Sequence, residues 1–174
     1  MIRALFLSVS LLAAFLYGTP ANSADITVLP KSIGGLSVIE ITGTLEFSDG
    51  DKFANVATTY NSALVVFSSD GGNLLAALRI GQLIRLRHFI TLVPDGARCA
   101  SACAIAWLGS EKRFMQPTAR IGFHAASTIE NGIAIESDAG NALVGAYLSR
   151  LGLSDSAIFY IAQAHPNEIK WMTK

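Results

Sequence analysis

The chain is poor in charged residues. Only 15% of its 174 residues are charged, and 13 basic and 13 acidic side chains give a formal net charge of zero. It contains no cluster of lysine and arginine interleaved with aromatics and no nucleotide-binding motif, so neither nucleic acid nor a nucleotide is expected as a partner. No repeat, low-complexity tract or linker divides the sequence. Its length suits one domain with a sizeable core.

Cysteine is also scarce, with Cys99 and Cys103 as the two examples. Without a neighbouring histidine they supply too few ligands for zinc, so we expect no metal and no cofactor. They stand four residues apart, about one helical turn, which brings their Cα atoms near the upper end of the disulfide range. In an exported protein they could oxidise and close a small ring around Ser101. The alternative is a pair of small buried thiols, and the sequence leaves both open.

Long apolar runs are limited to the N-terminus. Met1–Arg3 is a short basic start, Ala4–Tyr17 is an uncharged and mostly apolar run, and Gly18–Ala24 is rich in small residues. This three-part layout is typical of a secretory signal peptide. Ala21 and Ser23 suit cleavage after Ser23, although cleavage one residue later is nearly as good. The sequence therefore predicts a signal peptide over residues 1–23.

The remainder, residues 24–174, is expected to be a secreted or periplasmic domain. The apolar run of the signal is shorter than the roughly 20 residues that a membrane span requires. A membrane contact is expected only if this segment stays uncleaved as an anchor.

Strand and helix patterns alternate along the mature chain. Apolar runs, many of them β-branched, predict strands at 26–29, 36–43, 63–67, 89–93, 113–115 and 119–123. Helical spacing of apolar residues predicts helices at about 52–60, 73–87, 100–108, 143–151 and from 154 onward. Residues 127–138 mix glycine, serine, asparagine and glutamate with isoleucines, and we expect them to form an exposed excursion. The alternation predicts the α/β fold class.

A serine and a histidine stand where such a fold could present them. Ser101 lies among small residues between Cys99 and Cys103, where a strand would end and a helix begin, and His124 ends another short apolar run. A serine hydroxyl is a weak nucleophile until a base removes its proton, so the two form a candidate nucleophile–base pair. The start of a helix offers free N–H groups to a developing oxyanion. Cysteines replace the glycines of a Gly-x-Ser-x-Gly elbow, so the α/β-hydrolase motif is absent.

The order of the motifs resembles the ClpP/crotonase superfamily and, within it, the exported ClpP-like proteins. The motifs are Ile41–Gly43, Ser69–Gly72, Ala100–Ala102, Lys112–Phe114 and the strand ending in His124. Each one alone is weak, but their joint spacing is specific and covers most of the mature chain. The resemblance implies a single domain built as a spiral of β-β-α units.

Roles for individual residues follow from the resemblance. It implies that Ser101 is the nucleophile and His124 the general base. The N–H of Ala102 and the Gly71–Gly72 turn would form the oxyanion hole, because glycine lets a backbone approach a peptide closely. Asp70 stands where the superfamily has a proline, and we interpret it as a turn residue.

The superfamily has a third catalytic residue, an acid that orients the histidine, and this sequence departs from the pattern there. The resemblance places an acid shortly before an aromatic landmark, which here matches Trp171, and an ungapped match puts Ile169 at the position of the acid. Asn167 and Glu168 lie close by. Asn167 is predicted as the catalytic partner, since an asparagine can orient a histidine; Glu168 and no partner at all are the alternatives.

Two further implications concern the base and the assembly. Related exported peptidases use a lysine base, but no lysine occurs between Lys112 and Lys170, which favours a Ser–His pair. Residues 127–138 match the handle region of the superfamily, which lines substrate and supports assembly into rings. A homo-oligomer acting on a peptide or protein substrate is therefore expected.

The leading hypothesis is an exported serine peptidase that hydrolyses peptide bonds in unfolded or small peptide substrates. The runner-up is a catalytically silent module of the periplasm that keeps the fold for binding or assembly. A crotonase-type enzyme acting on acyl thioesters is a weaker third option, because an exported location has no obvious supply of coenzyme A.

Overall fold

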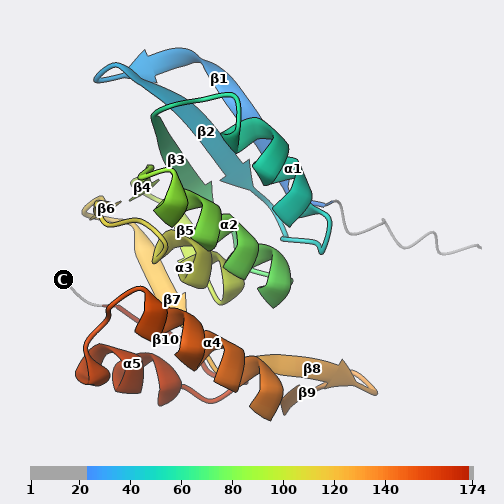
Figure 1. Ribbon diagram of the computed structural model, residues 1–174. Coiled ribbons are helices and arrows are strands. Elements are labelled where there is room, and N and C mark those ends of the chain that lie inside the picture. The colour runs from blue at the N-terminus through green and yellow to red at the C-terminus, as the bar shows by residue number, and fades with distance from the viewer. Residues whose placement is uncertain (1–22, 173–174) are drawn as a thin grey trace, which may run out of the picture.

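The computed structural model describes residues 23–172 as a mixed α/β domain (Figure 1). The predicted signal peptide, apart from Ser23, lies outside the described residues. The strands are β1 (Asp25–Ile33), β2 (Leu36–Thr42), β3 (Ala63–Ser68), β4 (Ile90–Val93), β5 (Arg98–Ala100), β6 (Arg113–Met115), β7 (Arg120–Phe123), β8 (Ser127–Glu130), β9 (Ile133–Glu136) and β10 (Lys170–Trp171). The helices are α1 (Asp49–Ala57), α2 (Leu74–Leu86), α3 (Ala102–Trp107), α4 (Asp138–Arg150) and α5 (Asp155–Ala162).

Three sheets organise the described chain. A five-stranded sheet has the order β1-β2-β3-β4-β6, in which β1 is antiparallel to β2 and the other pairs are parallel. A three-stranded sheet has the order β10-β7-β5, and β8 and β9 form a separate hairpin. Strand β3 is an almost continuous apolar run, as expected of a parallel strand covered on both faces. The α/β class predicted from the alternation of elements is confirmed.

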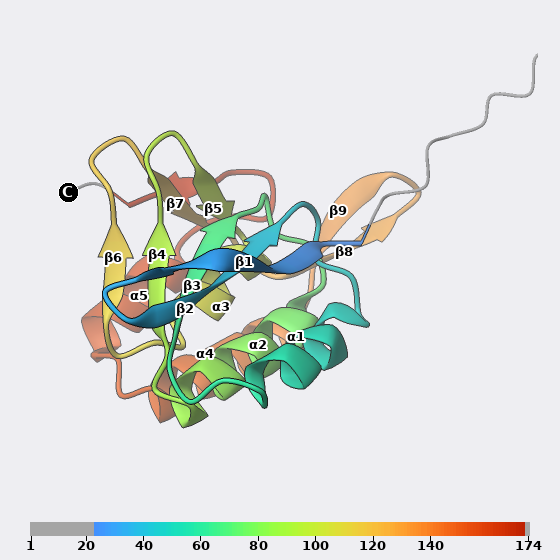
Figure 2. The ribbon, with the colours of Figure 1, turned by 90° about the horizontal axis from the view of Figure 1, so that it is seen from above.

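Helices cover the sheet and enclose one core. Figure 2 shows α1 and α2 along one face of the five-stranded sheet, while the β8–β9 hairpin extends away from the body. Helix α2 begins where Asn73 caps it, its side-chain oxygen accepting from the N–H of Ala76 at 3.0 Å. Phe53, Phe67 and Ile80 are fully buried between these layers. None of the helices among residues 23–172 has the length and hydropathy needed to cross a bilayer.

Two short strands and a hairpin depart from the sequence expectation. Strand β5 ends just before Ser101, where a strand end was expected but no strand was delimited, and β10 lies in the tail. The excursion expected at 127–138 is exposed, but most of it is the ordered β8–β9 pair. Helix α4 starts at Asp138, where Ser137 caps it through the N–H of Gly140, and not at 143.

Candidate active site

A cavity of about 900 Å³ brings the predicted nucleophile and base together. Ser101 and His124 both line it, together with Gly72 and Ala102. Its walls come from the starts of α2 and α3, the segment after β7, the hairpin and helices α4 and α5. The β5–β7 pairing explains the proximity, because Ala100 aligns with Gly122 in neighbouring parallel strands, just before Ser101 and His124.

Ser101 has an unusual backbone conformation. Its φ is 54° and its ψ is −126°, a region that non-glycine residues seldom occupy. The residue forms the sharp turn between β5 and α3, and its N–H donates to the carbonyl of Gly122 at 2.9 Å. Such strain persists where the surrounding structure imposes it, and it is concentrated at functional sites. The sequence placed Ser101 at a strand–helix junction but carried no signal for this conformation.

The glycines of the predicted oxyanion turn fit tightly against their neighbours. A Cβ atom on Gly71 would lie 2.7 Å from Cβ of Ser101 and 2.8 Å from the carbonyl oxygen of Ala100. A Cβ atom on Gly72 would lie 2.2 Å from the carbonyl oxygen of Leu45. Both glycines have positive φ, 105° and 129° respectively. Glycine is therefore required at both positions.

Two backbone donors remain free beside Ser101. The N–H of Gly71 donates to the Ser69 hydroxyl at 3.1 Å and is therefore occupied. Within the described part of the chain, no hydrogen bond engages the N–H of Gly72 or of Ala102. Gly72 and Ala102 line the same cavity as Ser101. They are the donors of the predicted set that can receive an oxyanion.

The ring of His124 is held by the backbone. Its Nδ1 lies 2.7 Å from the carbonyl oxygen of Ala125, which accepts a hydrogen bond from Nδ1–H in the tautomer that this contact favours. Nε2 is then an acceptor, as a general base requires. Across residues 23–172 no hydrogen bond joins this ring to the Ser101 hydroxyl. In active sites without substrate this bond is often long and tightens on binding.

The segment expected to orient His124 runs beside the end of β7, with an aliphatic residue at the register position next to His124. Strand β10 pairs antiparallel with β7, with Lys170 opposite Phe123, so Ile169 is the next residue along toward His124. Asn167 is exposed in the preceding turn, does not line the cavity, and makes no hydrogen bond to His124 in the described structure. The exposed side chain of Glu168 shares that turn.

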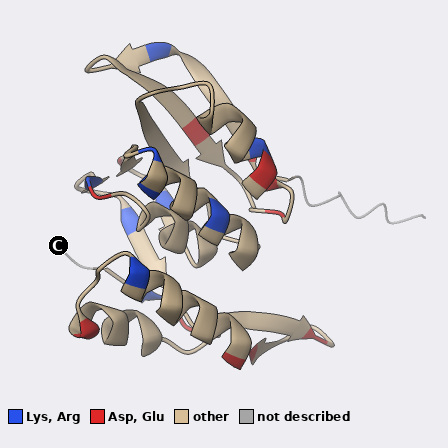
Figure 3. Cartoon of the chain, in the orientation of Figure 1, with Lys and Arg blue, Asp and Glu red and all other residues tan. Residues whose placement is uncertain are grey.

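Charge around the cavity is sparse. Acidic and basic residues are spread over the fold (Figure 3), and the carboxylates that line the cavity belong to Asp70 and Glu136. Asp70 forms an exposed ion pair with Arg98 at 2.7 Å, which agrees with its interpretation as a turn residue. The described residues contain no group of three or more histidine, cysteine, aspartate or glutamate side chains that could hold a metal.

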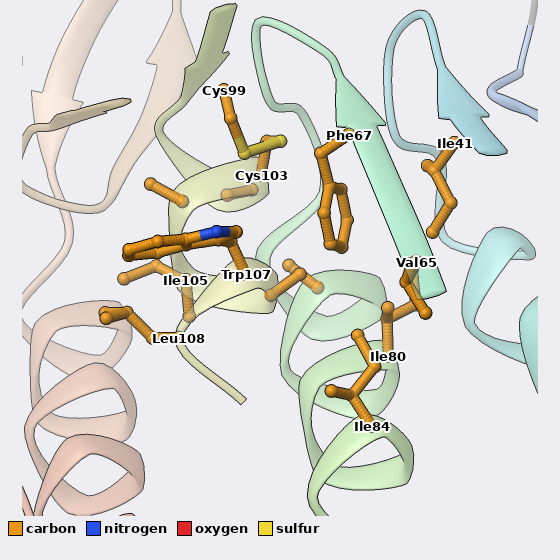
Figure 4. Packing of buried hydrophobic residues seen from close by; sticks show 14 of the residues in the cluster. Ile41, Val65, Phe67, Ile80, Ile84, Cys99, Cys103, Ile105, Trp107 and Leu108 are labelled. Carbon is orange, nitrogen blue, oxygen red and sulfur yellow. A yellow bond between two sulfur atoms is a disulfide. The ribbon is translucent and has the colours of Figure 1, made fainter. Parts of the chain in front are cut away.

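A disulfide joins Cys99 to Cys103 across Ser101. Their Cα atoms are 5.2 Å apart, and both residues are fully buried. Figure 4 shows the bridge packed among apolar side chains that include Phe67 and Trp107. Of the two arrangements that the sequence left open, the structure has the disulfide and not two free thiols. The strained serine is thus enclosed in a small covalent ring.

Apolar side chains form much of the remaining wall. They come from α2 to α5: Leu74, Leu75, Ile105, Leu143, Val144, Leu148, Ile158 and Ile161. A cavity of this size and largely apolar lining is typical of ligand-binding sites.

Comparison with known proteins gives matches in structure only. No protein-family model matches this sequence, and no curated protein matches it. A serine variant of the 1510-N membrane-bound stomatin-specific protease matches with a TM-score of 0.61 and 24% identity, over 72% of this chain and 68% of that one. A lysine variant of the same protease, in complex with a substrate peptide, matches with a TM-score of 0.60 and 26% identity, over 72% and 64%. ClpP1 from Listeria monocytogenes matches with a TM-score of 0.57 and 17% identity, over 78% and 82%.

These similarities define the class of the fold. The domain resembles the ClpP/crotonase fold of serine peptidases, as expected from the order of its motifs. The chain spans about two thirds of the length of the stomatin-specific protease structures.

Proposed function

We propose that this chain is an exported serine peptidase of ClpP-like fold. The observation that carries the proposal is the strained conformation of Ser101 in a cavity that His124, Gly72 and Ala102 also line. The disulfide supports an exported location, since such bridges persist in oxidising compartments. The solved complex of a structural neighbour with a substrate peptide supports a peptide as the ligand.

The reaction follows from the positions of these groups. Ser101 Oγ attacks the carbonyl carbon of a peptide bond as its proton passes to Nε2 of His124. The N–H groups of Gly72 and Ala102 bind the negative oxygen of the tetrahedral intermediate. The C–N bond then breaks, and His124 gives the proton to the leaving amine. Water, activated by the same base, hydrolyses the acyl-enzyme and restores Ser101. The carbonyl of Ala125 keeps the ring oriented throughout, and the predicted role of Asn167 stays a prediction.

A fluorophosphonate probe tests the proposal directly. We expect the probe to label the wild-type protein and to leave Ser101→Ala unlabelled, since the probe forms its bond with an activated serine hydroxyl. Ser127→Ala is a matched control, because Ser127 lines the same cavity at the start of β8, and this variant should label like the wild type. Equal labelling of Ser101→Ala and the wild type would refute the assignment of the nucleophile.

The second candidate is a catalytically silent module. It is favoured by Ile169 at the position of the acid and by the absence of a hydrogen bond between Ser101 and His124 in the described residues. A wild-type protein that is folded but inert toward the probe would support it.

Assembly into a homo-oligomer is part of the proposal. The β8–β9 hairpin exposes three isoleucines, Ile129 at 71%, Ile133 at 62% and Ile135 at 44%. Ile133 and Ile135 share one face of the hairpin, and Ile129 lies on the other face. Exposed apolar side chains on both faces are consistent with an interaction surface. The mass in solution would establish the number of copies.

A further inference from the structure

A carboxylate outside the cavity is buried at the start of α1. The side chain of Asp49 is 0% exposed, and the proposed reaction does not use it. Burying a carboxylate is costly unless it is paired and hydrogen-bonded, so its partners indicate what it does. The start of β1 lies beside the first turn of α1, where this group sits (Figure 1).

Asp49 is surrounded by donors. Oδ1 accepts from the Ser23 hydroxyl at 2.6 Å and lies 2.9 Å from Nζ of Lys52, while Oδ2 accepts from the N–H of Ala24 at 3.1 Å and of Glu46 at 2.7 Å. Burial alone would raise the pKa of Asp49, but the hydrogen bonds from Ser23, Glu46, Lys52 and Ala24 outweigh it and lower the pKa. The group is thus an ionised acceptor that joins the β1 entry to the loop before α1.

That loop brackets the oxyanion turn. Glu46, which Asp49 holds, follows Leu45, whose N–H donates to the carbonyl of Gly71 at 2.7 Å. The carbonyl of Leu45 accepts from the N–H of Asn73 at 2.7 Å. Leu45 therefore fixes the residues on both sides of Gly72, and its carbonyl oxygen occupies the space of a Cβ there.

We infer that Asp49 is a positioning residue for the oxyanion hole, which it acts on through Glu46 and Leu45. The inference rests on the proposed function for its catalytic consequence. Its physical content is that the carboxylate fixes the backbone at residues 45–46, which in turn fixes the direction of the Gly72 N–H. An oxyanion donor that shifts by a fraction of an ångström loses much of its effect on the transition state.

Charge as well as size matters at this position. All four partners donate, and three of them, Ala24, Glu46 and Lys52, remain after the predicted cleavage behind Ser23. A carboxylate is purely an acceptor. An asparagine has the same shape but would direct an NH₂ group at donors on one side. Asp49→Asn therefore tests the contact without opening a cavity.

The matched control is Asp51→Asn. Asp51 lies on the same helix, and its carboxylate forms an ion pair with Arg79 at the surface, with 60% of the side chain exposed. This variant removes an equal charge from the same turn but touches neither the loop nor the oxyanion turn.

Kinetics on a chromogenic peptide provide the first readout. We expect Asp49→Asn to lower kcat by about tenfold or more and to leave KM within about twofold, because oxyanion contacts form in the transition state. Asp51→Asn should match the wild type in both constants. A fully folded Asp49→Asn variant with wild-type kcat would overturn the inference.

Amide hydrogen exchange provides a second readout that needs no activity. We expect Asp49→Asn to speed exchange in residues 43–48 and 69–73, while β4 and α5 exchange as in the wild type. Unchanged exchange at 69–73, or faster exchange throughout the domain, would also overturn the inference. A wild-type protein that does not react with the fluorophosphonate probe would refute the proposed function but not the role of Asp49. The exchange measurement would still decide that role.

Discussion

The positive φ of Ser101 costs about 1–3 kcal/mol of backbone strain, the usual range for such conformations. Three contacts hold it there: its N–H on Gly122, the backbone of Gly71 against its Cβ, and the covalent ring from Cys99 to Cys103. A serine that served only to fill space would not need this conformation. Among single residues, the backbone strain of Ser101 is therefore the strongest support for its proposed role as the nucleophile.

Gly71→Ala tests how closely the turn must approach Ser101. The added methyl would meet Cβ of Ser101 at 2.7 Å and the Ala100 carbonyl at 2.8 Å, so the turn or the serine must move. We expect the rate of fluorophosphonate labelling to fall by about tenfold or more. Gly96→Ala is the control, because Gly96 has a φ of 75° but no atom within 4 Å of its Cβ position. It bears the strain of positive φ alone and should label at the wild-type rate.

At the scale of elements, strong local patterns predicted the main architecture. The continuous apolar run of β3 and the periodic apolar face of α2 gave their class and approximate bounds, and the order of the motifs gave the fold. Strands β5 and β10 have only three and two residues, and each forms because it pairs with β7. For β10 this partner is far away in the sequence. The strand propensity of a few residues does not predict a pairing partner elsewhere in the sequence.

The candidate site was predictable to the same limited degree. Ser101, His124, Gly72 and Ala102 were found from motif order and share the cavity. The role of Asp49 in supporting these residues was not predicted, because Asp49 lies just ahead of the helix expected at about 52–60 and belongs to no motif. Its role depends on contacts with residues up to 26 positions away.

The crossing of α2 with the segment after α3 depends on two glycines. A Cβ on Gly81 would lie 2.0 Å from the Tyr147 hydroxyl, and one on Gly109 would lie 2.2 Å from the carbonyl oxygen of Gly81. Tyr147 is fully buried on α4, and its hydroxyl has no hydrogen-bond partner among the described residues. Helix α2 can thus approach its neighbours only with glycine at these points.

Gly81→Ala should lower the free energy of unfolding by about 2 kcal/mol, because overpacking of a buried contact outweighs the better helix propensity of alanine. Urea denaturation measures the change. Gly145→Ala is the matched control, since Gly145 is helical with open space at its Cβ position, and its stability should stay equal or rise. Tyr147→Phe removes the hydroxyl that the new methyl meets and should restore part of the loss. A Gly81→Ala variant as stable as the wild type would show that the packing of α2 against its neighbours can shift to accommodate the methyl group.

At the scale of the whole molecule, Asp49 links the N-terminal edge of the sheet to the rest of the domain. Its pKa is lowered in the folded state from an ordinary value of 3.8, so the unfolded chain binds the proton more tightly. The stability that this carboxylate contributes is present above pH 3.8 and is lost as the pH falls through its folded pKa.

The pH dependence of unfolding should show this linkage. We expect Asp49→Asn to be less stable than the wild type at about pH 6 and the gap in the free energy of unfolding to narrow as the pH falls below 3.8, because the unfolded wild-type chain takes up the proton before the folded one does. Urea titrations of both proteins at each pH measure the gap. A gap that stays constant over this range would mean that the two states bind the proton equally.

The burial of the disulfide controls its chemistry with other thiols. Thiol–disulfide exchange requires a thiolate to reach one sulfur, and both Cys99 and Cys103 are closed off by the core. An external reductant can therefore act only when the region around α3 opens, so the rate of reduction measures local opening. The same barrier applies in reverse, since an oxidant must reach the two thiols before the core closes over them. The bridge therefore responds to a change in redox conditions only as fast as this region opens.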